Sequence, residues 1–163
     1  MEVSKRQQEY REKVDKWKGI SDKQREWMWK LFIADDVKRN HWYEITAQND
    51  IEFLLERFGG FHDAYIETIE LKNAILEHKN GYVLMTFSNC WVESLIQLKF
   101  SGLHRLNLIG KKCEPFYECH LSHDGKIIFA DNYSFDPSKI DEESKDTIFV
   151  ISDKLCWRFI DKI

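Results

Sequence analysis

The sequence predicts an α+β fold, with N-terminal helices packed on a largely antiparallel sheet of about seven or eight strands. Two observations lead to this class. Before Phe61, apolar residues recur with the period of an amphipathic helix. From Phe61 onward, apolar and polar residues alternate between turn dipeptides, which is typical of strands. Because helices and strands come in blocks, a doubly wound nucleotide-binding sheet is disfavoured.

Two helices are expected in residues 1–41. Residues 4–18 are rich in Lys, Arg, Gln and Glu, and their apolar positions fall on one stripe of a helix. Gly19 is a typical helix stop, and Ser21 and Gln24 have the spacing of a capping box. We therefore expect a helical arm that packs on the sheet or forms a homodimer by pairing with a second copy of the chain.

A third helix is expected directly before the first strand. Ile51–Phe58 carries its apolar residues on one face, and Asn49 or Asp50 can cap its first turn. Gly59-Gly60 then ends the helix, since glycine tolerates the left-handed conformation common at helix ends.

Strands are expected wherever apolar and polar residues alternate. Asn80-Gly81 and Asp124-Gly125 predict hairpins, because both central positions of a type I′ turn need positive φ. Breaks are also expected at Ser101-Gly102 and at Ser152–Lys154, the second of which would form the turn of a last hairpin. The expected strands cover residues 69–72, 82–87, 95–100, 104–108, 116–122, 126–130, 147–151 and 155–160.

Composition and charge limit the classes of function. The chain has 163 residues, of which 43% are hydrophobic, and this suits a single domain over 1–163, with 1–41 as a helical arm and 42–163 as the α+β body. Residues 1–41 contain 11 Lys and Arg against 8 Asp and Glu, whereas residues 42–163 contain 13 against 20. An acidic body lacks the concentrated basic face that nucleic acids require, so no nucleic-acid partner is expected.

Several strong local motifs are missing from the sequence. The longest apolar runs are four residues, far below the roughly 18 of a membrane span, so no membrane partner is expected. Met1–Gln8 lacks the apolar stretch of a secretory signal, which predicts a cytoplasmic protein. Phosphate-binding glycine loops, a GxSxG elbow and an HExxH helix are also missing. An enzyme is therefore the less favoured class, and no cofactor is expected.

The candidate polar site is the pair His62 and Asp63, at the corner between the third helix and the first strand. An imidazole beside a carboxylate can serve as a general acid or base. If both residues are extended, however, their side chains point to opposite faces. The structural interpretation is then a fixed corner in which they bond backbone groups. The functional alternative is an enzyme or small-ligand pocket formed by these two residues and His104.

The other histidines and the cysteines are weaker candidates for a functional site than His62 and Asp63. A metal site would draw on Cys113, Cys119, His120 and His123. If residues 119–123 are extended, only two of these side chains share a face, whereas structural zinc needs four ligands, so no metal site is expected. Cys90 carries no local sign of a nucleophile.

Residues 131–146 form the longest polar stretch, and their spacing does not fit a calcium-binding EF-hand loop. An acidic loop is a good contact surface for a basic partner protein. The candidate partner-binding residues are Asp136, Asp141, Glu142 and Glu143.

A family resemblance begins at Phe61-His62-Asp63-Ala64. It continues through Ile66–Leu71 and Trp91–Leu108 and covers about residues 50–160. In these segments the chain resembles small bacterial proteins of unknown function that carry a Phe-His-Asp-Ala/Ser motif at the entry to a β-rich domain. Some of these proteins look like immunity proteins of polymorphic toxin systems.

The resemblance implies a protein-binding module that neutralises a partner by occlusion. It brings no catalytic residues. Residues 1–41 fall outside it, and Gly59-Gly60 stands where a Trp-Pro is usual.

Overall fold

The computed structural model has an α+β fold, as predicted. It describes residues 5–31, 37–73, 80–89, 92–109, 115–116, 119–140 and 146–161. Within these ranges, three α-helices accompany a seven-stranded sheet whose strand pairs are all antiparallel. The sheet order is β2-β3-β4-β7-β6-β5, and β1 also pairs with β7.

The helices and strands are bounded as follows, with η marking a 3-10 turn. They are α1 (Lys5–Asp15), α2 (Asp22–Leu31), β1 (Tyr43–Ile45), α3 (Gln48–Phe58), η2 (Gly59–Phe61), β2 (Ala64–Lys72), β3 (Tyr82–Asn89), β4 (Val92–Asn107), β5 (His120–His123), β6 (Ile127–Ala130), η3 (Pro137–Lys139) and β7 (Phe149–Ile160). Within the described residues, none of the helices is long and apolar enough to cross a bilayer.

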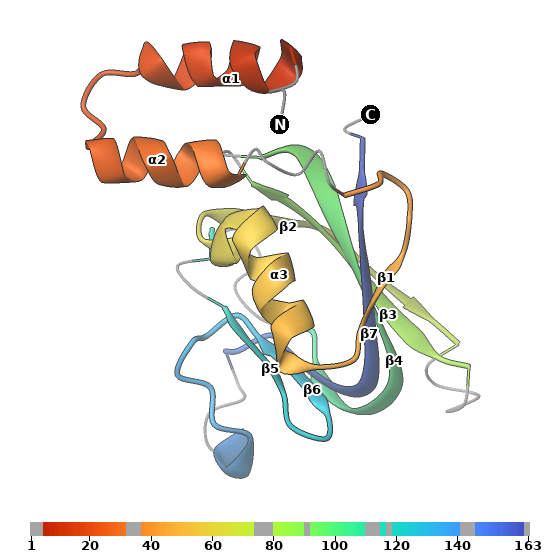
Figure 1. Cartoon of the computed structure of the whole chain (residues 1–163). Helices are drawn as coiled ribbons and strands as arrows, with labels where there is room; N and C mark the ends of the chain where they lie inside the picture. The colour runs from red at the N-terminus through yellow and green to blue at the C-terminus, as the bar shows by residue number, and fades with distance from the viewer. Residues whose placement is uncertain are drawn as a thin grey trace.

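The main core lies between α3 and the sheet, which curves around this helix (Figure 1). Ile51, Leu54 and Phe58 of α3 are completely buried against the inward side chains of β3, β4, β6 and β7. Burying one such side chain stabilises the fold by about 1.5–3 kcal/mol. The packing on the sheet is thus made by α3, which follows strand β1 in the chain.

α1 and α2 form a helical hairpin that lies beside α3 (Figure 1). The predicted capping box opens α2: the backbone N–H of Gln24 donates to Ser21 Oγ at 3.2 Å, and the N–H of Ser21 donates to Gln24 Oε1 at 2.8 Å. Arg25 then links the two helices, because Nη1 donates to the carbonyl of Val14 at 2.6 Å. Homodimerisation through residues 1–41 stays a prediction.

Short-range hydrogen bonds fix both ends of α3. The Asp50 carboxylate accepts hydrogen bonds from the N–H groups of Thr46 and Ala47, and these bonds hold the pKa of Asp50 below its usual value. At the other end, Gly59 is left-handed and its N–H donates to Leu55. The predicted N-cap at Asn49 or Asp50 is therefore wrong: Ala47 is the N-cap, α3 begins at Gln48, and Asp50 binds the N–H groups before the helix from inside its first turn.

β4 and β7 run through both predicted breaks, and this part of the prediction is wrong. Ser152–Lys154 does not form a hairpin turn but belongs to β7, where it pairs with residues 101–103 of β4. Ser101-Gly102 lies inside β4, and the register shifts just after residue 103. Residues with turn-like composition fit here because the strands bend and bulge together, and cross-strand pairing outweighs the local preference for a turn.

Part of the polar stretch 131–146 packs against the sheet. Phe135 and Ile140 are buried against Phe149 and Ile151, in a second, smaller apolar cluster on the face of β6 and β7. The rings of Phe135 and Phe149 stack with centroids 5.1 Å apart. Two buried apolar side chains therefore hold residues 131–140 to the sheet. The acidic composition of this stretch did not indicate such a contact.

Candidate functional site

The corner after α3 is a left-handed turn. Gly59, Gly60 and Phe61 have φ angles of +66°, +63° and +62°, and the N–H of His62 donates to the carbonyl of Gly59 at 3.1 Å. Glycine adopts this conformation freely, whereas an L-residue such as Phe61 loses about 1–2 kcal/mol in it. The ring of Phe61 is completely buried and packs edge-on against Phe58. Burial of the ring offsets the backbone strain.

His62 and Asp63 contact each other at this corner. Asp63 is also left-handed, with φ of +59°, and β2 begins only at Ala64. The two side chains therefore do not alternate as they would in a strand, and His62 Nδ1 lies 2.9 Å from Asp63 Oδ2. Their side chains are 45% and 36% exposed. The carboxylate thus orients the imidazole, a geometry that the assumption of an extended chain had disfavoured.

Asn89 holds the corner from the neighbouring strand β3. Its side chain is 1% exposed, and Nδ2 donates to the carbonyl oxygens of His62 at 2.8 Å and of Phe58 at 3.5 Å. The N–H of Asp63 donates to Phe116 at 2.8 Å, so a second segment fixes the same turn. Sequence reasoning missed Asn89. Its signal is a polar residue at an inward position of a strand, after Phe87 and other buried residues.

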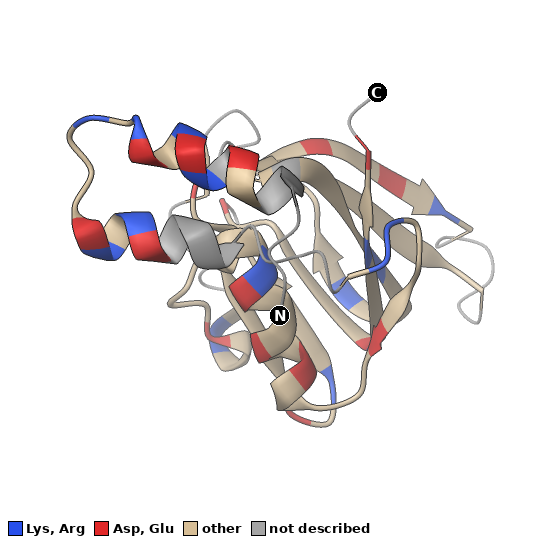
Figure 2. Ribbon diagram, turned by 45° about the horizontal axis from the view of Figure 1, so that its top comes forward, with Lys and Arg blue, Asp and Glu red and all other residues tan. Residues whose placement is uncertain are grey.

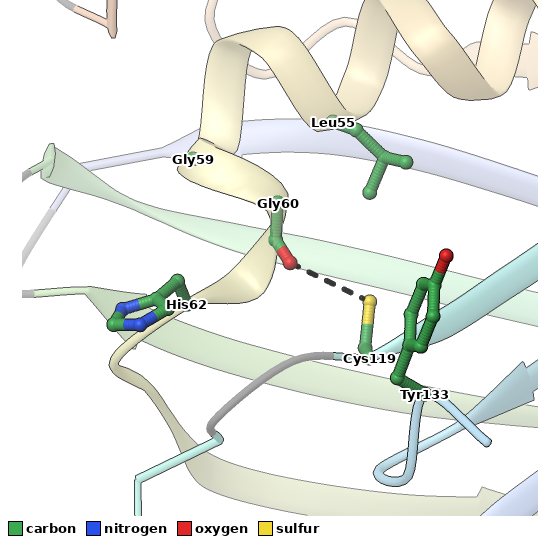
Figure 3. A pocket seen from close by; sticks show the side chains of 6 residues that line it. All are labelled: Leu55, Gly59, Gly60, His62, Cys119 and Tyr133. Carbon is green, nitrogen blue, oxygen red and sulfur yellow. Dashed lines mark hydrogen bonds between the residues drawn. The ribbon is translucent and has the colours of Figure 1, made fainter. Parts of the chain in front are cut away.

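An open pocket of about 500 Å³ lies beside the corner (Figure 3). Its walls come from α3, from the left-handed turn, from the start of β5 and from the 131–140 loop. Gly60 leaves this space open, since no atom lies within 4 Å of where its Cβ would be. The lining residues are Leu55, Gly59, Gly60, His62, Cys119 and Tyr133.

The polar groups of the pocket point in different directions. Figure 3 shows Cys119 and Tyr133 on one side of Gly60 and the ring of His62 on the other. The thiol of Cys119 donates to the carbonyl of Gly60, with Sγ 3.7 Å from the oxygen. The pocket therefore presents the phenol of Tyr133 at one wall and an oriented imidazole at the opposite wall.

Tyr133 reaches this pocket from a loop that is fixed in place. Its side chain is 66% exposed, and its carbonyl oxygen lies 3.4 Å from His120 Nδ1. His120 Nε2 also lies 2.9 Å from the hydroxyl of Ser122. His120, considered above as a metal ligand, thus supports the loop that carries Tyr133. Among the described residues, no group of three His, Cys, Asp or Glu side chains is placed to hold a metal ion.

Of the predicted partner-binding residues, Asp136 has a role within the loop. Its carboxylate accepts from the N–H of Ser138 at 2.9 Å and from its hydroxyl at 2.7 Å, and so caps η3. These hydrogen bonds lower the pKa of Asp136. Asp141, Glu142 and Glu143 lie outside the described residues, as do Cys90 and Cys113.

His104 does not line this pocket. It lies at the bend of β4 and β7, where His104 Nε2 is 2.6 Å from Asp153 Oδ1. This hydrogen bond lowers the pKa of Asp153. The predicted grouping of His104 with His62 and Asp63 is therefore wrong, because pairing of β4 with β7 places His104 at another part of the sheet.

The pocket thus combines two regions that were predicted separately: the His62 corner and the acidic stretch that carries Tyr133. No family model, curated protein or solved structure matches the chain. The resemblance to the Phe-His-Asp proteins stays an expectation.

Proposed function

We propose that the chain is a protein-binding module of the immunity type, which neutralises a partner by covering the partner's functional site. One observation carries this proposal: a single pocket borders both candidate regions, with His62 at one wall and Tyr133 at the other. A partner side chain that enters the pocket would contact the corner and the loop together. The pocket is therefore the centre of the proposed contact face.

Tyr133 is the residue on which we expect binding to depend most. Tyrosine is enriched among the residues that dominate the energy of protein interfaces. Its loop is already ordered by Phe135 and Ile140, so binding would immobilise few additional groups, and this lowers the entropic cost of association. The proposed partner supplies an apolar or aromatic side chain that fills the space between Leu55 and Tyr133.

Charge supports a basic partner. The body, residues 42–163, has 13 Lys and Arg against 20 Asp and Glu. Long-range attraction would raise the association rate, and added salt would lower it. Asp136 and the acidic residues 141–143 belong to the stretch that also carries Tyr133, so they would act on the same encounter.

The experiment is to capture partners from the source lysate with the purified chain at low and high salt, and to identify them by mass spectrometry. The affinity of the captured protein is then measured for Tyr133→Ala and for Ile109→Ala, an exposed apolar control outside the pocket. We expect Tyr133→Ala to raise Kd by about tenfold or more and the control to change little. Equal affinities for both variants would contradict this placement.

A second candidate function is the binding or conversion of a small ligand. It is favoured by the His62 imidazole, which Asp63 orients at the wall of a pocket large enough for a small molecule. An NMR fragment screen on the isolated chain tests it. Saturable shifts of Leu55, His62 and Tyr133 that disappear in His62→Ala would favour this function, and a screen without such shifts would remove it.

A further inference from the structure

A second surface, separate from the pocket, lies along β2. In the sheet formed by the described residues, this strand stands at one end, next to β3. On its other side, Phe116 exchanges backbone hydrogen bonds of 2.8 Å with Asp63 and with Ala64, the first residue of the strand. Within the described parts of the chain, no strand pairs with this side from Tyr65 to Lys72. Figure 2 shows β2 at the rim of the sheet.

The side chains of β2 form two rows of different chemistry. Ile66, Ile69 and Leu71 pair with buried residues of β3 and therefore face inward, although Leu71 remains partly exposed. Thr68 and Glu70 pair with residues of the outer face. Glu67 and Glu70 make this rim acidic, and Figure 2 shows red segments along the strand.

Basic side chains among the described residues neutralise little of the negative charge of Glu67 and Glu70. Glu67 accepts a hydrogen bond from the hydroxyl of Ser88, and among the described residues it forms no ion pair. Glu70 Oε2 lies 3.3 Å from Lys72 Nζ, in an exposed pair that contributes little stability. A cation brought to this rim would therefore meet a carboxylate that no described basic side chain neutralises.

A groove of about 530 Å³ adjoins these carboxylates on the same face. Glu67, Thr68 and Glu70 form its β2 wall, and Thr86, Gln97 and Ile160 contribute from the next three strands of the sheet. Thr86 is 5% exposed; its hydroxyl accepts from Gln97 Nε2 at 3.3 Å and donates to no described residue. The groove thus has room for a long side chain, and the Thr86 hydroxyl, which has a second lone pair, is a buried acceptor for a basic one.

We propose that β2 pairs with an extended segment of a partner protein in which basic and apolar residues alternate. Backbone hydrogen bonds would extend the sheet by one strand. Because side chains alternate along a strand, the basic residues would lie over Glu67, Glu70 and the groove, while the apolar residues would lie beside Ile69 and Leu71. A second copy of this chain fits poorly, since two β2 strands would bring their carboxylates together.

The test uses a defined probe, the acetylated and amidated peptide KVKVKVKVK, which has the nine-residue length of β2. Its comparator, KKVVKKVVK, has the same composition without strict alternation. Binding to the full chain is followed by NMR shifts and by amide hydrogen exchange. We expect the alternating peptide to bind more tightly, and to shift and protect amides of residues 65–72 at the rim.

Charge variants give the second measurement. The double variant Glu67→Lys/Glu70→Lys should raise Kd of the alternating peptide by about tenfold or more, because attraction becomes repulsion. Glu52→Lys/Glu56→Lys on α3 makes the same change in net charge at exposed positions and should alter Kd by less than about twofold. No binding, equal binding of both peptides, shifts away from β2, or an equal effect of the α3 control would each overturn the proposal. None of these outcomes concerns Tyr133, so the pocket is tested separately.

Discussion

Two His–Asp pairs lie in different settings in this protein, and the contrast separates a candidate site from a structural contact. His62 and Asp63 are neighbours in sequence, and the left-handed turn that joins them forms the wall of a pocket. His104 and Asp153 come from separate strands and meet where β4 and β7 bend together. In the first pair the histidine thus lines a cavity and the aspartate orients it, whereas the second pair connects two strands. The setting of the pair, rather than its chemistry, identifies the candidate site.

The largest effect is expected at Phe61, in the turn before the first pair. Phe61→Ala removes a completely buried ring and should lower the free energy of unfolding by about 3–5 kcal/mol. Phe61→Gly removes the same ring but also relieves the left-handed strain, so it should be about 1 kcal/mol more stable than the alanine variant. Urea unfolding of both variants measures this difference. An alanine variant more stable than the glycine variant would contradict the strained turn.

Glycines near the two pairs should differ in their tolerance of a side chain. At Gly102, a Cβ would lie 2.6 Å from Asp153 Oδ2 and 2.8 Å from Asp153 Cβ, in a backbone with φ of +65°. Gly102→Ala should therefore cost about 2–3 kcal/mol, from overpacking and strain together. Gly60→Ala meets no atom within 4 Å and should cost only about 1 kcal/mol of strain. If thermal or urea unfolding shows that both variants lose the same free energy of unfolding, this predicted difference is wrong.

Asn89 supports the turn that carries the first pair. Asn89→Ala leaves the buried carbonyl oxygens of His62 and Phe58 without this donor and should cost about 1–3 kcal/mol. Because the turn then loses the support of Asn89 and keeps that of Phe116, NMR shifts should change at His62 and Asp63 but not at His104. Shift changes of equal size at both pairs would show that Asn89 acts on the whole sheet rather than on the corner.

The smallest effect concerns pH at the second pair. The hydrogen bond from His104 lowers the pKa of Asp153, so its contribution to stability is present above the unfolded-state pKa and is lost as pH falls through the folded-state pKa. The stability difference between wild type and His104→Gln should therefore be present at about pH 5 and shrink toward about pH 2. Urea unfolding across this range measures it. A difference independent of acid pH would contradict the role of this hydrogen bond.

Local chemistry was enough to predict the start of α2 and the end of α3. The Ser21–Gln24 pair and Gly59 act through bonds that span only a few residues, and each does what its type and spacing predict. Asp50 also forms such bonds, but from inside the first turn of α3 rather than as the predicted N-cap. The predicted β5–β6 hairpin also forms, although its turn covers the three residues 124–126 and has positive φ at Gly125 but not at Asp124, so it is not the predicted type I′ turn. Such features can be predicted from the sequence because they depend on hydrogen bonds between residues that are close together in the chain.

Features that depend on distant pairing were missed. Ser152–Lys154 has the composition of a turn, yet β4 pairs with it and keeps it extended. β1 has only three residues, too few for an alternating pattern, and is defined by its pairing with β7. In the pocket, His62 was found from its local string. Tyr133 was missed because its polar neighbours conceal that Phe135 anchors the loop against Phe149.

Amide hydrogen exchange of the chain with and without its captured partner protein tests the central claim most directly. If the pocket is the contact face, the partner should slow exchange in residues 59–63 and 131–136 together, since both segments border it. Exchange at the β4–β7 bend, around His104 and Asp153, should stay unchanged. Protection confined to that bend or to α1 and α2, with the two pocket segments unaffected, would contradict the account.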